Sequence, residues 1–457
     1  MSPAAPNSAG RVGAPGGDFD AIVVGAGPAG TAAALGLTQK GVNVLLLERG
    51  EYPGAKNMFG GMMAYCPVAE QLVPGFWERA PWERAVTKRA LSVVAGGSST
   101  SLVFQAASGS DAPSVGGGST SDRTLTGFTL FRPLFDRWFA EQAVAEGVTL
   151  LTNCRAESLV VHDGSVGGVR LTGSGDVIEA PLVVACDGTL SLVAKEAGLH
   201  AGFKPEHVAL GVRALFALSA EEIDERFGLV GREGATREFL GCTEGVRGGG
   251  FIYTQTDTLS VGLVVHLDSL KERAIPPYEL MERFLASTDV ASLLRGARLV
   301  EYSAHLLPEA GLRMVPRLSM GGLLLAGDAA GLCYTNGLIQ EGMNLAMTSG
   351  LLAAQVGAGA IEAGDLSARR LSAYGKELKR SFVLRDLKTF GRAIKFMHHD
   401  RLFTEYPQVV SALMEDLYRA DGTPKRKIAR LGLRALKGRV SARHVIGDAY
   451  QGGRGYL

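Results

Sequence analysis

The feature that most constrains the fold is the stretch DAIVVGAGPAGTAAALGLTQKGVNVLLLERG near the N-terminus. Residues 22–24 are apolar and predict a buried strand, residues 31–39 are rich in Ala and Leu and predict a helix, and residues 42–47 predict the next strand. Glycines fill the turn between the first strand and the helix. This order predicts a βαβ unit of an open α/β sheet.

The glycines of the turn have separate tasks. Gly25 allows the tight turn, Gly27 lets backbone approach a pyrophosphate, and Gly30 lets the helix pack on the strand. Free N–H groups at the helix N-terminus favour an anion there. Glu48, 18 residues after Gly30, ends the second strand and is expected to accept hydrogen bonds from ribose hydroxyls. These residues predict a dinucleotide site but do not separate FAD from NAD.

Two further strands end in an acidic residue. PLVVACDGTLSLVAKEAGL carries Asp187 and Gly188, and GGLLLAGDAAGLCYTNGLIQEGMNLAMTSG carries Gly327 and Asp328. Both pairs are candidate cofactor-binding residues, because an open α/β sheet binds its ligand at the carboxyl ends of its strands. For each aspartate alone, helix capping is the alternative.

All three motifs together resemble the glutathione-reductase-type FAD fold, in its hydroxylase-like branch. The resemblance implies FAD as cofactor, with Asp328 at its ribityl or pyrophosphate part. In FRPLFDRWFAEQAVAEGV, it implies that Arg132 reaches the FAD phosphates, and it places Ala156 by the adenine. It also implies backbone contacts with the pyrimidine edge of the flavin from Gly342, Met343 and Asn344. No second G-x-G-x-x-G unit follows for NAD(P)H, so electrons are expected from another protein or from a nicotinamide that binds transiently.

The loop RGEYPGAKNMFGGMMAY follows the second strand directly. Its Lys and Asn can hydrogen-bond the flavin ring, its paired glycines can lie flat against isoalloxazine, and Tyr65, a candidate catalytic residue, can close the pocket. A glycine turn with exposed Lys and Asn side chains is the alternative. The candidate cofactor-binding residues of the loop are Arg49, Lys56, Asn57, Gly60 and Gly61.

Segments outside the FAD motifs identify a narrower family. PGAKNMFGGMMAY, PGFWERAPWERAV, RGGGFIYTQTDTLSVGLVVHLDSL and EYSAHLLPEAGLRMVPRL closely resemble the FixC-type branch of electron-transfer-flavoprotein:quinone oxidoreductases. The resemblance covers roughly residues 18–400. It implies that Gly248 and Gly249, with Phe251, approach the quinone head, which is compatible with a hairpin turn there. The candidate proton sources for a reduced quinone are Tyr253, Tyr302 and His305, and satisfied core residues are the alternative for each.

The resemblance also implies partners. The five cysteines lie far apart without metal-ligand spacing, and the last is Cys333, so no metal and no iron–sulfur cluster are expected in this chain. FixC-type subunits work with a small ferredoxin-like iron–sulfur subunit and with electron-transfer-flavoprotein alpha and beta type subunits, which oxidise NADH and bifurcate its electrons. This chain would then be the arm that reduces a membrane quinone. The net charge of +1 gives no reason to expect nucleic acid.

The expected fold is α/β: a discontinuous Rossmann-like FAD-binding domain, an α+β substrate/quinone domain and a mostly helical C-terminal region. The expected division is a disordered N-terminus (1–17), FAD-binding segments (18–95, 128–200 and 298–370), a flexible Gly/Ser-rich hairpin insertion (96–127), the substrate/quinone domain (201–297) and the C-terminal region (371–457).

No signal peptide or membrane-spanning segment is expected, so the predicted location is cytoplasmic, at the inner face of the cell membrane. The basic segment, residues 425–443, has eight basic residues and no acid. It could lie on an anionic membrane or contact an acidic partner, and a solvated face is the alternative. For the whole chain, the alternatives are a geranylgeranyl-reductase-like isoprenoid saturase, a flavin monooxygenase, and a non-enzymatic flavin relay or scaffold subunit.

Overall fold

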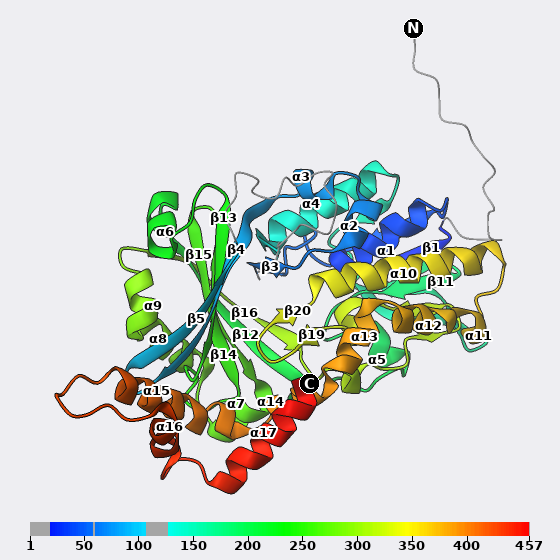
Figure 1. Cartoon of the computed structure of the whole chain (residues 1–457). Coiled ribbons are helices and arrows are strands. Elements are labelled where there is room, and N and C mark those ends of the chain that lie inside the picture. Colours follow the sequence, from blue (N-terminus) through cyan, green and yellow to red (C-terminus); the bar gives the residue numbers. More distant parts are fainter. Residues whose placement is uncertain (1–18, 58–59, 107–126, 457) are drawn as a thin grey trace.

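The computed structural model describes residues 19–57, 60–106 and 127–456 (Figure 1). The expected N-terminal segment, residues 1–17, and residues 107–126 of the expected insertion lie outside the described residues. Within the described parts, no helix has both the length and the apolar character needed to cross a membrane.

The predicted βαβ unit is confirmed, with the helix beginning three residues earlier than expected. Strand β1 (Ala21–Val24), helix α1 (Pro28–Thr38) and strand β2 (Val44–Leu47) follow one another. The six-stranded sheet has the order β17-β18-β11-β1-β2-β7, and β1 is parallel to both neighbours. Its other strands are β7 (Thr149–Leu151), β11 (Leu182–Ala185), β17 (Ser319–Met320) and β18 (Leu323–Leu325).

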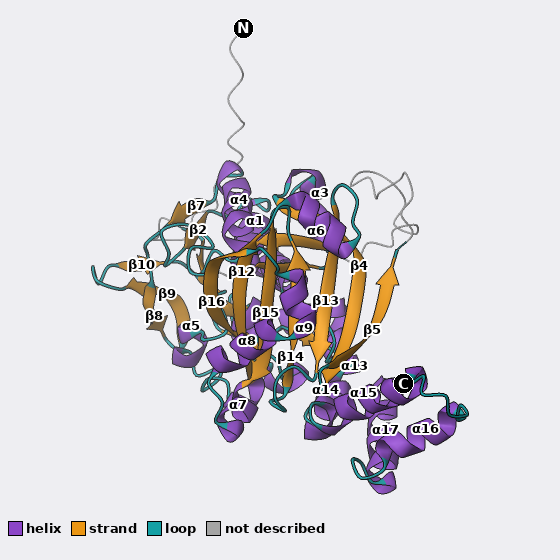
Figure 2. Ribbon diagram, turned by 90° about the vertical axis from the view of Figure 1, so that its left-hand side faces the viewer, coloured by secondary structure: helices purple, strands orange, loops and turns teal. Residues whose placement is uncertain are grey.

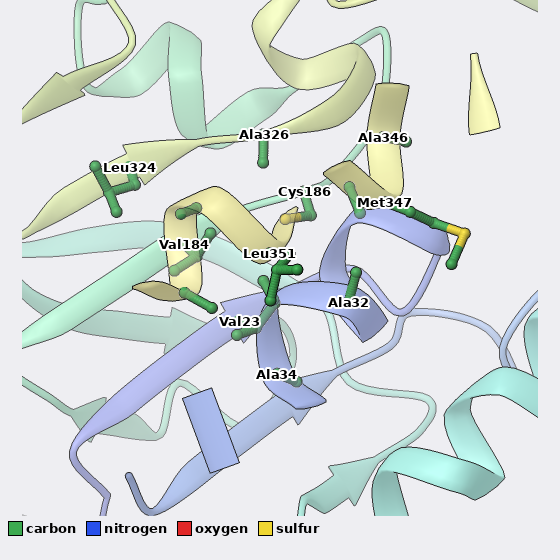
Figure 3. Close-up of a cluster of buried hydrophobic side chains, with 14 of the residues drawn as sticks. Val23, Ala32, Ala34, Val184, Cys186, Leu324, Ala326, Ala346, Met347 and Leu351 are labelled. Atoms are coloured by element: carbon green, nitrogen blue, oxygen red, sulfur yellow. The ribbon is translucent and has the colours of Figure 1, made fainter. Parts of the chain in front are cut away.

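Small residues allow two helices to pack closely beside this sheet. Helix α10 (Met343–Glu362) lies along α1, as Figure 1 shows. A Cβ added to Gly350 would lie 2.1 Å from the carbonyl oxygen of Ala29, and one added to Gly36 would lie 2.9 Å from the Cβ of Ala354. Alanines and leucines of both helices fill the core above the strands (Figure 3). Because the backbones are so close, the N-terminus of α10 is held next to the glycine turn.

A larger sheet of nine strands lies beside the first. Its order is β16-β12-β15-β14-β13-β4-β6-β3, with β5 paired to β4, and helices cover one face around a second apolar core (Figure 2). The strands are β3 (Gly60–Met63), β4 (Trp82–Ala95), β5 (Ser98–Gln105), β6 (Phe128–Phe131), β12 (Val208–Ala217), β13 (Glu233–Leu240), β14 (Gly248–Thr254), β15 (Thr258–His266) and β16 (Arg298–Pro308). Strands β4 and β16 come from segments expected to bind FAD, but they belong to this sheet. In it, β4 pairs with β13 and β16 pairs with β12.

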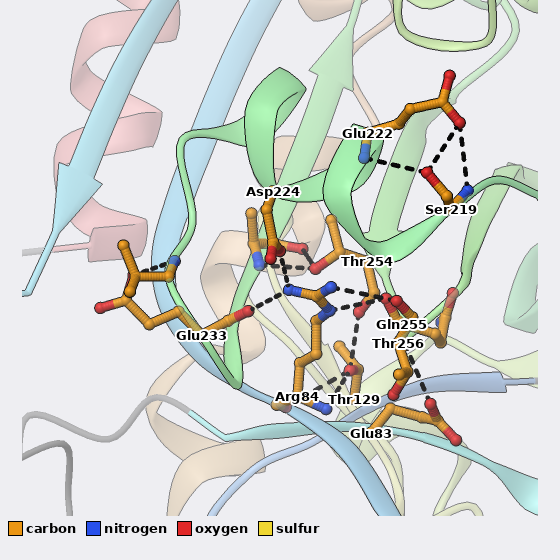
Figure 4. Close-up of polar contacts among 12 residues, drawn as sticks. Glu83, Arg84, Thr129, Ser219, Glu222, Asp224, Glu233, Thr254, Gln255 and Thr256 are labelled. Atoms are coloured by element: carbon orange, nitrogen blue, oxygen red, sulfur yellow. Dashed lines mark hydrogen bonds and ion pairs between the residues drawn. The ribbon is translucent and has the colours of Figure 1, made fainter.

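One arginine ties several segments of the nine-stranded sheet together. The guanidinium of Arg84, whose side chain is 3% exposed, donates to the carbonyl oxygens of Gln255 (2.8 Å), Glu233 (2.9 Å) and Thr256 (3.1 Å) and pairs with Asp224 (Figure 4). A buried cation requires such partners, since burial without them is costly. The network joins β4 to the β14–β15 turn and to helix α6 (Ala220–Phe227).

The remaining elements up to residue 371 form two small sheets and several helices. A three-stranded sheet contains β8 (Ala156–His162), β9 (Ser165–Leu171) and β10 (Val177–Glu179), and a short hairpin contains β19 (Tyr334–Thr335) and β20 (Gln340–Glu341). The other helices before residue 371 are α2 (Pro67–Leu72), α3 (Phe76–Arg79), α4 (Arg132–Ala145), α5 (Leu192–Glu196), α7 (Leu267–Arg273), α8 (Pro277–Ala286), α9 (Thr288–Leu293), η2 (Pro205–His207), η3 (Gly311–Met314), η4 (Gly327–Ala330) and α11 (Ala368–Leu371).

The C-terminal region is helical, as predicted. Its helices are α12 (Ala373–Arg380), α13 (Phe382–Thr389), α14 (Gly391–Met397), η5 (Asp400–Leu402), α15 (Glu405–Tyr418), α16 (Ile428–Leu436) and α17 (Ala442–Tyr456). Helix α15 packs on β4 and β5, and α17 packs on α14. The carboxylate of Asp448 on α17 accepts from Arg401 at 2.6 and 2.7 Å and from Tyr406 at 2.8 Å, which holds α17 in place.

Candidate functional site

The glycine turn has the geometry that a pyrophosphate site needs. Gly25 has φ +99°, and a Cβ there would lie 2.5 Å from the carbonyl oxygen of Cys186. A Cβ on Gly30 would lie 1.8 Å from the carbonyl oxygen of Gly25. Gly27 differs, because a Cβ there would meet only the Arg132 side chain, at 3.7 Å, among the described atoms. Gly25 and Gly30 therefore shape the turn, whereas Gly27 leaves room beside the N-terminus of α1.

Glu48 lies at the end of β2, buried, beneath this turn. Its Oε2 accepts from the backbone N–H of Ala26 at 3.2 Å and its Oε1 from that of Gly50 at 2.6 Å. Both bonds fix the carboxylate at the strand end, where the motif expects a ribose. The neighbouring Arg49 is exposed.

A charged cluster lies next to the turn. Arg132, the first residue of α4, donates to both carboxylate oxygens of Asp136, each at 2.8 Å. With its amide oxygen turned toward Arg132, Asn57 accepts from both terminal nitrogens at 3.0 Å. Burial alone would lower the pKa of Arg132, but the carboxylates of Asp136 and Asp328 raise it. The structure thus brings Asn57, Arg132 and Asp328 together, and their contact with FAD stays a prediction.

The two strand-end aspartates differ in what they do in the protein. Asp187 accepts from the hydroxyl of Ser191 at 2.6 Å and from the N–H groups of Leu192 (2.8 Å) and Val193 (3.2 Å), so it contacts the first turn of α5, whose N-cap is Ser191. The expected contact of Asp187 with the cofactor stays a prediction. Gly188 follows with φ +82°.

Among the described residues, the Asp328 carboxylate accepts from no N–H group at a helix N-terminus. Asp328 is half-buried, and its carboxylate accepts from the Thr189 hydroxyl at 3.4 Å. Burial raises the pKa of Asp328, while the Arg132 charge opposes this. Gly327 before it has φ +61° and donates its N–H to Ser349 at 2.9 Å. The Asp328 carboxylate thus lies near Arg132 and can accept a further hydrogen bond.

The N-terminus of α10 offers polar groups beside these residues. Gly342, Met343 and Asn344 form its first turn, and the Asn344 amide nitrogen donates to Glu341 at 2.7 Å. Within the described chain, the buried Asn344 amide oxygen has no hydrogen-bond partner. A buried acceptor without a donor indicates a missing ligand group, which fits a cofactor at this helix end.

Other predicted cofactor residues are more dispersed. Gly60 and Gly61 lie in β3, paired with β6, and Tyr65 stacks on Trp77 with ring centroids 5.1 Å apart. The side chain of Lys56 is exposed, and Ala156 is buried at the start of β8. None of these positions alone identifies a ligand.

The predicted substrate residues lie together in one cavity of about 110 Å³. Gly248, Gly249, Phe251 and Tyr253 of β14 line it, and so do Thr335 and residues 337–340, which precede the Asn344 turn of α10. The rings of Phe251 and Tyr253 stack with centroids 4.8 Å apart. Burial raises the pKa of Tyr253 far above its usual range, so its hydroxyl remains protonated.

The two other candidate proton sources are absent from the described lining of this cavity. Tyr302 on β16 is 49% exposed. His305, also on β16, lies near Arg132 and Arg49. Burial, with the charges of these two arginines, lowers the pKa of His305 to about 4.

The residues of the cavity wall that the sequence did not indicate include the titratable side chains of His266, Glu309 and His398. His266 ends β15 and Glu309 directly follows β16. The available signal was a polar residue that ends or follows a largely apolar strand. His398 carries no such signal.

Comparisons with known proteins agree with this geometry. Three family models match: FAD dependent oxidoreductase over residues 20–204, ETF-QO ubiquinone-binding over residues 209–307, and the ETF-QO/FixC family C-terminal domain over residues 393–457. Protein FixC of Escherichia coli (strain K12) is 39% identical over 419 residues, which covers 91% of this chain and 94% of that protein. The chain belongs to the ETF-QO/FixC family.

Other relatives of this FixC-family chain give the same result. Protein FixC of Azorhizobium caulinodans is 37% identical over 96% of this chain and 99% of its own length. A probable electron transfer flavoprotein-quinone oxidoreductase, YdiS of Escherichia coli (strain K12), is 37% identical over 90% of this chain and 93% of its own length. The predicted family, α/β fold, FAD cofactor and oxidoreductase class are confirmed.

Solved structures confirm the fold of the FixC-family chain. A geranylgeranyl bacteriochlorophyll reductase-like protein from Thermoplasma acidophilum has a TM-score of 0.70 at 19% identity, covering 94% of this chain and 98% of that one. The flavin-dependent brominase Bmp2 has a TM-score of 0.60 at 15% identity, covering 95% of this chain and 98% of that one. At these identities the likeness concerns the fold alone.

Proposed function

We propose that this chain takes electrons from an electron-transfer flavoprotein and passes them to a membrane quinone. One observation carries the proposal: the cavity is lined by strands that match the ubiquinone-binding model and by residues 337–340, which lead into the α10 terminus expected to meet the flavin. Ligand sites at such junctions are concave, mostly apolar and lined by a few polar groups, as this cavity is.

Different residues of the FAD-binding half would bind different parts of the cofactor. The glycine turn and the N-terminus of α1 would hold the pyrophosphate, since free N–H groups and the helix dipole favour an anion. Glu48 would bind the adenosine ribose, and Asp328 the ribityl or pyrophosphate part. Arg132, already paired with Asp136, would contribute donors toward the phosphates. FAD, when bound, would accept electrons from one partner and release them to another.

The expected flavin-ring contacts come from two segments. The loop of residues 49–65 would supply Lys56 and Asn57 as donors, with Gly60 and Gly61 against the ring and Tyr65 at its edge. The first turn of α10 would meet the pyrimidine edge, where the Asn344 amide oxygen can accept from a ring N–H. This contact would satisfy an acceptor that is otherwise buried without a donor.

The cavity residues would position the quinone head. A Cβ on Gly248 would lie 2.1 Å from the carbonyl oxygen of Val264, and one on Gly249 would lie 2.5 Å from that of Phe239. The neighbouring strands therefore require glycine at both positions, and without side chains the backbone of both residues, which lines the cavity, could be approached closely by a planar ring. The Phe251–Tyr253 stack offers an apolar face and one hydroxyl donor.

The proposed assembly includes electron-transfer-flavoprotein alpha and beta type subunits and a small ferredoxin-like iron–sulfur subunit, with NADH as electron source and bifurcation of its electrons. This chain would be the quinone-reducing arm. Peripheral contact with the membrane would involve the basic segment, where α16 carries Ile428 (66% exposed) and Leu433 (70% exposed) among Lys and Arg side chains. Such a surface suits anionic lipid headgroups.

The direct test is to co-purify the chain from its native host and to record the visible spectrum with and without NADH. We expect two flavoprotein subunits and a small iron–sulfur protein to accompany it, and NADH to bleach its flavin only in that assembly. A chain that purifies alone, yellow, and is reduced directly by NADPH would contradict the proposal.

A further inference from the structure

Besides Tyr253 and Glu238, three titratable side chains line the cavity: Glu309, His266 and His398. They come from three elements, since Glu309 follows β16, His266 ends β15 and His398 follows α14. The Glu309 side chain is 14% exposed and that of His266 is 8% exposed. The fold thus brings these three side chains together in the wall of a cavity that Gly248 and Gly249 also line.

Glu309 carries a proton at neutral pH. Its Oε2 lies 3.4 Å from the Nε2 of His266, without hydrogen-bond geometry, and within the described residues Oε2 has no hydrogen-bond partner. No described Lys or Arg forms an ion pair with it. Burial raises the pKa of Glu309 to about 8. The other carboxyl group of the cavity wall, Glu238, differs because it is paired with Arg89 at 2.8 Å.

The two histidine rings follow one another from Glu309 to a partly exposed position. Their rings meet edge to face with centroids 5.1 Å apart, and His398 is partly exposed. Burial, aided by the Arg247 charge, lowers the pKa of both to about 4, although Asp268 opposes this. Both rings are therefore neutral at pH 7 and can each accept a proton and pass it on.

The surrounding charged groups are committed elsewhere. Arg247, directly before β14, pairs with Asp268 of α7 at 2.6 Å and with Asp400 of η5 at 3.2 Å. The remaining titratable groups that face the cluster are Arg313 of η3, which acts on His398; His207 of η2, beside Glu206; and Cys333, on which Glu309 acts. None of them supplies an ion-pair partner to Glu309 in the described chain.

We propose that Glu309 is the acid that protonates the substrate in this cavity, and that His398 and His266 reload it from solvent. The proposal rests on the proposed function. Reduction of a quinone to the quinol adds two electrons, supplied by the flavoprotein activity, and two protons. One proton leaves a Glu309 carboxyl oxygen and forms an O–H bond at one quinone carbonyl oxygen, and the opposite carbonyl oxygen takes its proton from solvent. The carboxylate left behind takes the ring N–H proton of His266 as the other ring nitrogen of His266 accepts a proton relayed from solvent through His398 in the same way, so both rings end neutral and Glu309 is protonated for the next turnover.

The test compares full-length wild type with Glu309→Gln, which keeps the shape of the side chain but has no acidic proton, and with Glu309→Asp. Glu244→Gln is the matched control, because Glu244 is exposed and outside the cavity lining. Each chemically reduced protein is mixed anaerobically with a short-chain ubiquinone, and separately with ferricyanide, which takes electrons without protons. Rates are followed from about pH 6 to about pH 9, in H₂O and D₂O.

We expect Glu309→Gln to slow quinone reduction roughly 100-fold at pH 7, which is the low end of general-acid effects. Ferricyanide reduction should be unchanged. The wild-type quinone rate should fall as the pH rises through about 8, because only the protonated carboxyl can donate. This fall and the solvent isotope effect should disappear in Glu309→Gln, and Glu309→Asp should restore part of both.

A readout without turnover is the carboxyl C=O infrared band of the oxidised protein. A band that titrates near pH 8 in wild type and in Glu244→Gln, but not in Glu309→Gln, would support the assignment. A variant Glu309→Gln that retains the wild-type quinone rate and pH profile would overturn it while leaving the proposed function intact. Equal loss with ferricyanide and quinone would also overturn it, by revealing a structural role. A wild type that reduces no quinone would overturn both.

Discussion

Replacing Gly27 by alanine should weaken FAD binding while leaving the fold of the apoprotein unchanged. Its φ of −78° is open to any residue, and an added Cβ would meet only an Arg132 terminal nitrogen, at the ordinary contact distance of 3.7 Å. The methyl group would instead occupy the space beside the N-terminus of α1, where the pyrophosphate is expected.

The magnitude follows from the hydrogen bonds at stake. Displacing the pyrophosphate by one methyl group should cost one charge-assisted hydrogen bond, worth about 1.5–3 kcal/mol. The dissociation constant for FAD should therefore rise about 10-fold to 150-fold. Gly30→Ala gives the contrasting case, because its Cβ would lie 1.8 Å from the carbonyl oxygen of Gly25. That variant should lose thermal stability as well as FAD.

The assay is a titration of apoprotein with FAD, followed by quenching of flavin fluorescence, with thermal unfolding of each apoprotein recorded by circular dichroism. Gly375→Ala in α12 is the control, since its Cβ would meet no described atom within 4 Å. Its FAD affinity should equal that of wild type. A Gly27→Ala protein that binds FAD within about threefold of wild type would refute the placement of the pyrophosphate at this turn.

Three further predictions concern other parts of the chain. Arg84→Met should lower the free energy of unfolding by about 3–5 kcal/mol in urea denaturation, because it leaves Asp224 and buried carbonyl oxygens without their donor; a loss below about 1 kcal/mol would contradict this. The Glu309 pKa is raised above its unfolded value, so its contribution to stability is lost as pH rises toward about 8. Relative to Glu309→Gln, wild type should therefore lose about 2 kcal/mol between about pH 6.5 and about pH 8, and a constant difference would contradict the raised pKa. Replacing Lys425, Arg426 and Lys427 together by Gln should weaken sedimentation with anionic phospholipid vesicles at low salt about 100-fold, at roughly 1 kcal/mol per charge, and unchanged binding would remove the basic segment from the membrane contact.

The FAD half was readable from sequence because its information is local. The glycine spacing, the apolar runs and Glu48 lie within one continuous unit, and its two strands and helix formed where expected, with α1 beginning at Pro28 instead of Thr31. For Asp187 the sequence left cofactor binding and helix capping open, and the structure adds hydrogen bonds from the N–H groups of Leu192 and Val193 in the first turn of α5.

The cavity could be read only in part, because it depends on pairing between distant strands. Gly248, Gly249, Phe251 and Tyr253 come from one segment, so a single motif finds them all. Glu309 reaches the same cavity because β16 pairs with β12, which pairs with β15. His305 lies four residues before Glu309, which is roughly 13 Å along an extended strand. It lies near Arg132 and Arg49 of the FAD-binding half. No local pattern distinguishes these two positions.

The most direct test of the central claim is an anaerobic stopped-flow experiment on the FAD-loaded chain. The reduced electron-transfer flavoprotein of the same host is mixed with it first, and a short-chain ubiquinone is added in the second mixing step. The account predicts that flavin absorbance falls in the first step and returns in the second, with one quinol formed for each two electrons. A flavin that the electron-transfer flavoprotein does not reduce, or that stays reduced in the presence of quinone, would contradict it.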